Sequence, residues 1–275
     1  MIPAKFDYER AGSVDEAIGL LHQHGDEAKL LAGGHSLLPL MKLRLAFPTV
    51  LIDVGRLTDL SYIRDEGDHV AIGALTRHRD LETSDILKRD VPILAFTAHL
   101  VGDPQVRHRG TLGGTLAHGD PASDLPAVVL ALGGTLVARG PGGEREIAAT
   151  EFFNGFLETA LADDEMLTEI RVPKVTGAGW SYQKFNRRAQ DWAIVGVAAV
   201  RNGTTGISLV NMGGTPLRAT AVEQALANGA SIDDAAARAA DGCEPSADLN
   251  ASVEYRQHLA RVLVRRALEE CASRT

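Results

Sequence analysis

Two pairs of adjacent glycines, about eighty residues apart, stand in contexts that could bind a phosphorylated ligand. The first pair lies in Ala32-Gly33-Gly34-His35-Ser36-Leu37, and the second lies in Thr111-Leu112-Gly113-Gly114-Thr115. Glycine has no side chain and readily adopts positive φ, so a ligand can approach its backbone closely. Successive exposed N–H groups in such a loop form a concave site for an anion. Two such loops, flanked by hydroxyl groups, predict a dinucleotide whose pyrophosphate lies between them.

Two acids follow the second glycine pair, and several roles are open to them. Asp120 and Asp124 could form a carboxylate pair for acid–base chemistry. Either could cap the helix that is expected to begin near Leu125, and this role is favoured for each residue taken alone. One of them could instead accept hydrogen bonds from ribose hydroxyls.

Familiar catalytic and metal-binding motifs are missing from the sequence. It contains neither Gly-Lys-Ser/Thr nor a Gly-x-Gly-x-x-Gly sequence after a strand. The segment Gly34-His35-Ser36-Leu37-Leu38 lacks the second glycine of a nucleophile elbow, which disfavours a serine hydrolase. His108 and His118 have no ligand-spaced partner, which disfavours a zinc site. The sequence therefore assigns no catalytic residue and no metal ligand.

Composition excludes several further classes. The chain has 275 residues, 45% of them hydrophobic, and no run of eighteen apolar residues that could span a membrane. Its start lacks the basic and apolar regions of a signal peptide. The net charge of −8 disfavours nonspecific nucleic-acid binding. Cys243 and Cys271 are the only cysteines, which suits a reducing cytoplasm and excludes an iron–sulfur cluster held by four thiolates of this chain.

The pattern of the chain predicts an α+β protein with two major units. A capping box at Ser13 to Glu16 begins a helix that ends near Gly25, and a strand over 29–32 leads into the first glycine loop. Small residues over 175–179 mark the main boundary. We expect a first unit of two lobes, about 1–58 and 59–175. A second unit over 176–275 should contain antiparallel strands at 180–186, 193–201 and 207–211, followed by three helices.

The segments around the two glycine pairs resemble those of a known family. Ala32-Gly33-Gly34-His35-Ser36-Leu37-Leu38-Pro39-Leu40-Met41-Lys42 and Thr111-Leu112-Gly113-Gly114-Thr115, with Pro121-Ala122-Ser123-Asp124-Leu125-Pro126, are similar to segments of the FAD-binding medium subunits of the xanthine dehydrogenase group of molybdenum hydroxylases. Within that group the resemblance is closest to the medium subunits of aerobic carbon monoxide dehydrogenases and their relatives. Segments 72–76, 169–173, 182–185 and 213–219 support it, so the resemblance covers nearly the whole chain.

The resemblance implies a fold, a function and partners. The fold would be a two-lobed FAD-binding domain of the PCMH or vanillyl-alcohol-oxidase type over 1–175, then a C-terminal α+β domain over 176–275. The chain would carry FAD and pass electrons from iron–sulfur clusters to a quinone or NAD. A small subunit would hold two 2Fe–2S clusters and a large subunit the molybdopterin cofactor. The complex is expected to be a cytoplasmic dimer of heterotrimers.

The resemblance also implies roles for particular residues. Ala32 to Leu37 and Thr111 to Thr115 would hold the FAD pyrophosphate through N–H groups and hydroxyls, and Asp124 would bind ribose hydroxyls. Thr115 departs from the asparagine that many relatives have. The implied cofactor-binding residues are Ala32, Gly33, Gly34, His35, Ser36, Leu37, Val101, Thr111, Gly113, Gly114, Thr115, Asp124, Leu167, Lys184 and Trp192.

Alternatives remain for two of these residues and for the function. Lys184 would reach the cofactor or lie as a solvated strand lysine, and Trp192 would shield the isoalloxazine or pack inside the protein. Gly33-Gly34-His35 also resembles a loop in stand-alone flavin oxidases of the berberine-bridge type, in which the histidine links covalently to FAD. A third possibility is a structural or regulatory homologue that has lost FAD.

Overall fold

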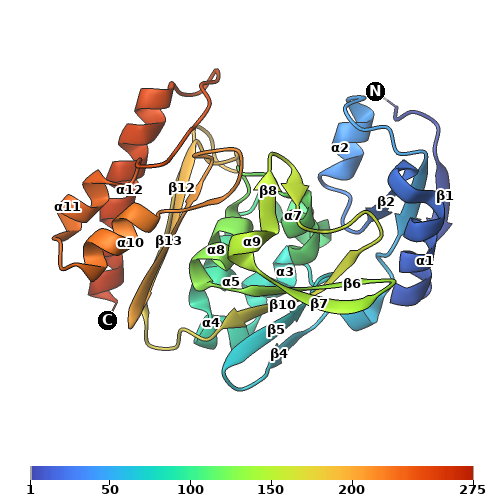
Figure 1. Ribbon diagram of the computed structural model, residues 1–275, viewed down its shortest axis with the longest axis horizontal. Helices are drawn as coiled ribbons and strands as arrows, with labels where there is room; N and C mark the ends of the chain where they lie inside the picture. The colour runs from blue at the N-terminus through green and yellow to red at the C-terminus, as the bar shows by residue number, and fades with distance from the viewer. Residues whose placement is uncertain (1, 275) are drawn as a thin grey trace.

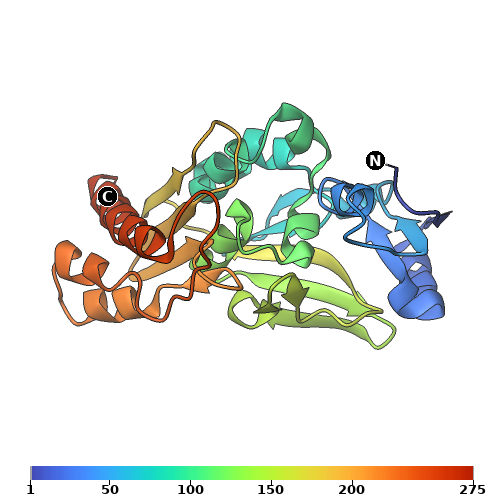
Figure 2. The same ribbon diagram turned by 90° about the horizontal axis from the view of Figure 1, so that it is seen from above.

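The computed structural model describes residues 2–274, in which the three larger sheets lie in three blocks along the longest axis. In Figure 1 the N-terminal block is on the right, the middle block is in the centre and the C-terminal block is on the left. The view from above keeps this order (Figure 2). The predicted α+β architecture, with a C-terminal antiparallel sheet and helices, is confirmed.

The N-terminal block is a parallel sheet with strand order β1-β3-β2. The predicted N-cap is confirmed, because Ser13 Oγ accepts a hydrogen bond from the Glu16 N–H at 3.1 Å, and Gly25 ends the helix at φ 57°. The reciprocal bond of a capping box differs, because the Glu16 carboxylate accepts from the Gly12 N–H at 2.7 Å instead of from the Ser13 N–H. Buried Ile18 and Leu21 of this helix pack on the sheet. The elements of the block are β1 (Asp7–Arg10), α1 (Val14–His24), β2 (Ala28–Leu31), α2 (Leu37–Lys42) and β3 (Val50–Asp53).

The middle block is a five-stranded antiparallel sheet, with strand order β4-β5-β10-β6-β7, and a set of short helices that share its core. A two-stranded hairpin, β8 with β9, stands beside it. The strands are β4 (Ile63–Asp65), β5 (His69–Gly73), β6 (Thr135–Gly140), β7 (Gly143–Ala148), β8 (Phe153–Gly155), β9 (Glu158–Thr159) and β10 (Met166–Pro173). The helices are α3 (His78–Thr83), α4 (Asp85–Asp90), α5 (Pro92–His99), α6 (Pro104–Arg109), α7 (Leu112–His118), α8 (Asp124–Leu132) and α9 (Ala149–Phe152).

The C-terminal block is an antiparallel sheet, β11-β12-β13-β14, covered by helices on both faces. Helix α12 packs on one face, and α5 and α8 of the middle block pack on the other. Because β12 is buried on both sides, its sequence is almost continuously apolar instead of alternating. The elements are β11 (Gly179–Phe185), β12 (Val195–Asn202), β13 (Thr204–Val210), β14 (Leu217–Arg218), α10 (Thr220–Ala227), α11 (Ile232–Ala237) and α12 (Val253–Ser273).

The sequence prediction of a second glycine loop was wrong. The second glycine pair does not lie in a loop: Gly113 and Gly114 occupy the first turn of α7, and Thr111 is the N-cap residue. A threonine at this position satisfies a free N–H of the first turn, which compensates for the poor helix propensity of two glycines. Among residues 2–274, no helix is long and apolar enough to cross a membrane.

Candidate functional site

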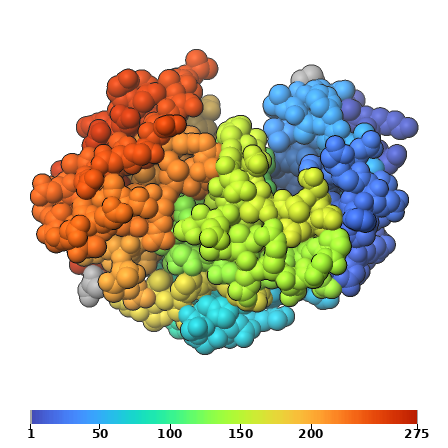
Figure 3. Space-filling model, viewed as in Figure 1, coloured from blue at the N-terminus to red at the C-terminus, as the bar shows by residue number. Residues whose placement is uncertain are grey.

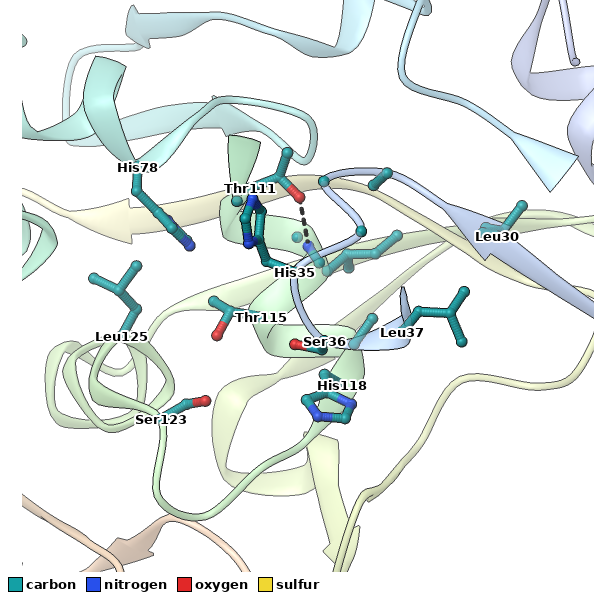
Figure 4. Close-up of a pocket in the computed structure, with 18 of the residues that line it drawn as sticks. Leu30, His35, Ser36, Leu37, His78, Thr111, Thr115, His118, Ser123 and Leu125 are labelled. Atoms are coloured by element: carbon teal, nitrogen blue, oxygen red, sulfur yellow. Dashed lines mark hydrogen bonds between the residues drawn. The ribbon is translucent and has the colours of Figure 1, made fainter. Parts of the chain in front are cut away.

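A single cavity gathers all fifteen residues that the sequence singled out. Its volume is ≈ 970 Å³, close to the upper end of the range of about 300–1,000 Å³ that is usual for small-molecule sites. All three blocks contribute to its lining. Figure 4 labels lining residues from the N-terminal and middle blocks. The space-filling view shows a hollow between the α2 region and the middle block at the top of the molecule (Figure 3). The sequence thus identified a set of residues that folding brings together.

The first glycine segment connects β2 to α2 and presents open backbone to the cavity. Gly34 has φ 76°, a left-handed conformation that favours glycine. A Cβ atom at Gly33 would lie only 2.4 Å from the carbonyl oxygen of Arg109. Within residues 2–274, the N–H groups of residues 33–36 donate no hydrogen bond to another protein group. This segment therefore combines close packing with free backbone N–H groups, which could donate hydrogen bonds to an anion.

The second glycine segment uses its backbone differently. The Gly114 N–H donates to Thr111 Oγ1 at 3.1 Å, drawn as the dashed line in Figure 4, and the Gly113 N–H donates to the Ala74 carbonyl at 2.8 Å. The N–H groups of Leu112 and Thr115 also have internal acceptors. A Cβ atom at Gly113 would lie 2.5 Å from that of Ala74. The segment is therefore a tightly packed start of a helix. Its threonine side chains line the cavity, and its glycines allow a ligand to approach the backbone closely.

Asp124 is buried beside the cavity and paired with the C-terminal sheet. One carboxylate oxygen accepts from the Tyr182 hydroxyl at 2.5 Å, and the other accepts from Lys184 Nζ at 2.8 Å. Lys184 Nζ also donates to the Leu100 carbonyl at 3.2 Å, and only 8% of its side chain is exposed. A solvated strand lysine is therefore ruled out for Lys184.

The predicted cap role of the two acids was wrong. Ser123 holds the N-cap position of α8, and Asp124 is the first residue of that helix. Asp120 accepts from the Ala122 N–H at 2.8 Å, which closes a local turn before the helix. Burial raises the pKa of Asp124, while the Lys184 ammonium opposes that shift. Burial beside Asp124 also raises the pKa of Tyr182 well above its ordinary value, so Tyr182 stays a protonated donor.

Apolar and aromatic side chains line the rest of the cavity. Val101 and the buried Leu167 contribute aliphatic surface. Trp192 lies in the loop between β11 and β12 and is 69% exposed, so its indole does not simply pack in the interior. The Arg188 guanidinium donates to Asp191 at 2.9 Å within that loop. An aromatic ring at the cavity edge could cover a planar ligand.

The sequence did not single out His78 or Ser123, which also line the cavity. His78 lies two residues after segment 72–76, which resembles the family. Its residue type was the only feature of the sequence that could have indicated a role at the site. Among residues 2–274, no cluster of three or more His, Cys, Asp or Glu residues could hold a metal ion. The arrangement thus offers backbone donors, hydroxyls, a buried ion pair and apolar surface.

Comparison with known proteins identifies similar chains along the whole length. A family model described as the FAD binding domain in molybdopterin dehydrogenase matches residues 4–175. A second model, the CO dehydrogenase flavoprotein C-terminal domain, matches residues 180–271.

Individual relatives cover the whole chain. The carbon monoxide dehydrogenase medium chain of Hydrogenophaga pseudoflava is 45% identical and matches 100% of this chain and 99% of its own length. Subunit alpha of the 6-hydroxypseudooxynicotine dehydrogenase complex of Paenarthrobacter nicotinovorans is 37% identical, over 100% of this chain and 97% of its own. The solved carbon monoxide dehydrogenase of Hydrogenophaga pseudoflava that lacks the Mo-pyranopterin moiety contains a chain with 46% identity and a TM-score of 0.96, covering 100% of this chain and 99% of that one.

Proposed function

Since the chain belongs to the family of FAD-binding medium subunits of molybdenum hydroxylases, we propose that it holds FAD and transfers electrons between partner iron–sulfur clusters and an external acceptor, a quinone or NAD. The observation that carries this proposal is the meeting of the two glycine segments at one cavity. Gly33 lies against Arg109 and Gly110, just before the second segment. A ligand placed there touches both segments.

The chemistry of the cavity fits FAD. The open N–H groups of residues 33–36, with the hydroxyls of Ser36, Thr111 and Thr115, suit an anionic diphosphate. The apolar side chains of Val101 and Leu167 suit the flavin ring. When bound, FAD supplies the electron-transfer chemistry, and the protein supplies binding, orientation and electrostatics. No residue of this chain then needs to act as an acid or base on a substrate.

The C-terminal block completes the site. We propose that residues 1–175 form the FAD-binding domain and that residues 176–275 form a second domain that closes over the flavin. Lys184 and Trp192 reach the cavity from this second domain. The Lys184 ammonium, held by the Asp124 carboxylate, would place a fixed positive charge beside the cofactor. Asp124 would bind a ribose hydroxyl with an oxygen lone pair that Tyr182 and Lys184 leave open.

The remaining redox centres would belong to partner chains. We propose a small subunit with 2Fe–2S clusters and a large subunit with the molybdopterin cofactor, assembled as a dimer of heterotrimers in the cytoplasm. Two cysteines in the whole sequence cannot supply the four thiolates of one cluster. The relative in Paenarthrobacter nicotinovorans is itself a subunit of a dehydrogenase complex.

The test is the flavin content and reduction of the chain alone and in its native complex. We expect the isolated chain to bind FAD at one equivalent and to release it into the supernatant on acid precipitation. A substrate of the native complex should reduce this flavin only when the iron- and molybdenum-containing subunits are present. A yellow acid pellet would favour a covalent flavin oxidase, and a chain that takes up no FAD would favour a flavin-free homologue.

A further inference from the structure

His78 is a buried histidine whose ring nitrogens have no partner within residues 2–274. It is the first residue of α3, and only 4% of the residue is exposed. Its Nδ1 atom is buried without a hydrogen-bond partner. Its Nε2 atom is not among the buried unpartnered atoms, and His78 lines the cavity. Figure 4 shows the ring directed from α3 toward the other labelled residues of the cavity.

The chain leaves space for this imidazole. A Cβ atom at Gly110 would lie 2.6 Å from His78 Cδ2 and 2.7 Å from His78 Nε2, so any larger residue at position 110 would displace the ring. The backbone N–H of His78 donates to the Gly110 carbonyl at 3.0 Å and fixes the start of α3 there. Gly110 directly precedes Thr111, the cap of α7. The ring is therefore held beside both glycine segments.

Burial determines the protonation of the ring. Desolvation lowers the pKa of His78 to about 4, and the nearby His35, Arg77 and Arg107 add to this effect. The ring is thus neutral and carries one proton. A buried N–H without an acceptor is less tolerable than a buried lone pair without a donor. The proton consequently belongs on Nε2, the nitrogen that faces the cavity, and Nδ1 is the bare acceptor.

We infer that His78 binds the cofactor by donating a hydrogen bond from Nε2–H to an oxygen of the diphosphate–ribityl part of FAD. The inference rests on the proposed function, because it assumes that FAD occupies this cavity. The position beside the two glycine segments favours this part of FAD over the ring system. The guanidinium groups of Arg77 and Arg107 lie near the ring and also favour an anionic neighbour.

The test compares FAD affinity in His78→Phe, His78→Asn and the control His108→Gln. Phenylalanine keeps a ring without a donor, whereas asparagine keeps a donor in less volume. His108 is exposed and lies outside the cavity lining. Titration of the apoprotein with FAD, followed by flavin fluorescence, should show binding weakened by about tenfold or more in His78→Phe. The loss should be smaller in His78→Asn and absent in His108→Gln.

A second measurement covers the case in which His78→Phe does not fold. Long-range ¹H–¹⁵N NMR of the wild-type chain with ¹⁵N-labelled histidine should show His78 protonated at Nε2, with a shift of that signal on FAD addition. A proton on Nδ1, or unchanged FAD affinity in folded His78→Phe, would overturn the inference. Wild-type protein that binds no FAD would instead overturn the proposed function, so the two failures are distinguishable.

Discussion

The two glycine pairs have the same dipeptide sequence but different structures. Gly33 and Gly34 follow a parallel strand in an open loop with a left-handed residue, and the backbone N–H groups of residues 33–36 lack protein acceptors within residues 2–274. Gly113 and Gly114 begin a helix, and their N–H groups are bonded to Ala74 and Thr111. The first pair therefore offers hydrogen-bond donors to a ligand, whereas the second pair only allows a ligand to approach the backbone closely.

This difference shows that glycines near a ligand site can be required for packing within the protein, and not only for contact with the ligand. Position 33 requires glycine because the backbone of Arg109 lies against it, and position 113 requires glycine because Ala74 lies against it. In both places a side chain would separate segments that are distant in the sequence. Substitutions at the two pairs should consequently affect FAD binding and protein stability in different proportions.

The largest effect is expected from Gly33→Ala. The new methyl group would lie 2.4 Å from the Arg109 carbonyl oxygen, so the two cavity walls must move apart. We expect FAD affinity to fall by about a hundredfold, equivalent to about 3 kcal/mol. Fluorescence titration of the apoprotein measures this. Gly19→Ala in α1 is the control, since nothing lies within 4 Å of its new methyl group, and it should bind FAD normally. Wild-type affinity in Gly33→Ala would show that the contact does not shape the site.

The next effect concerns pH and the histidine beside the second pair. The pKa of His78 is lowered to about 4 from 6.5, with His35, Arg77 and Arg107 nearby. Between these pH values the unfolded chain binds more protons, so this group makes the folded apoprotein less stable as pH falls, by about 3 kcal/mol in total. Urea unfolding at pH 7 and pH 4.5 measures the change. The pH dependence should be shallower in His78→Phe than in the wild type, and equal slopes would contradict the assignment.

A smaller effect is expected from Thr111→Val, which removes the hydroxyl that caps α7. The Gly114 N–H then loses its acceptor, and the free energy of unfolding should fall by about 1 kcal/mol. Thr115→Val is the matched variant, because no hydrogen bond of the Thr115 hydroxyl to residues 2–274 exists. It should unfold like the wild type yet bind FAD more weakly. Urea unfolding and FAD titration of both variants separate the cap from the ligand contact; equal stabilities would remove the cap role.

The smallest effect is expected from Gly114→Ala. Its methyl group would meet only the Thr111 side chain, with Oγ1 at 2.6 Å and Cβ at 3.9 Å, and the hydroxyl can rotate away. Alanine raises helix propensity by about 1 kcal/mol, which offsets the weakened cap. We therefore expect the free energy of unfolding to stay within about 0.5 kcal/mol of the wild type, measured by urea unfolding. A loss as large as that of Thr111→Val would mean that the cap and the helix start cannot adjust.

Local sequence predicted several elements correctly. The cap at Ser13, the end of α1 at Gly25 and the antiparallel strands of the C-terminal sheet depend on interactions within a few residues or on strand patterning. The short α4 and α6 were not predicted, although Ser84 and Asp103 cap them. Helices of six residues are too short to show a clear apolar period, so tertiary packing stabilises them.

The sequence by itself identified fifteen residues of the cavity lining, because the glycine segments and their neighbours match a family pattern along the chain. Only the tertiary structure decided what these residues do there. The partners of Asp124 lie 58 and 60 residues away, and the Gly33 contact joins residues 76 or more positions apart. Such pairings depend on how the three sheets pack, which no local spacing encodes. The same packing buries His78 and lowers its pKa, which keeps the ring neutral.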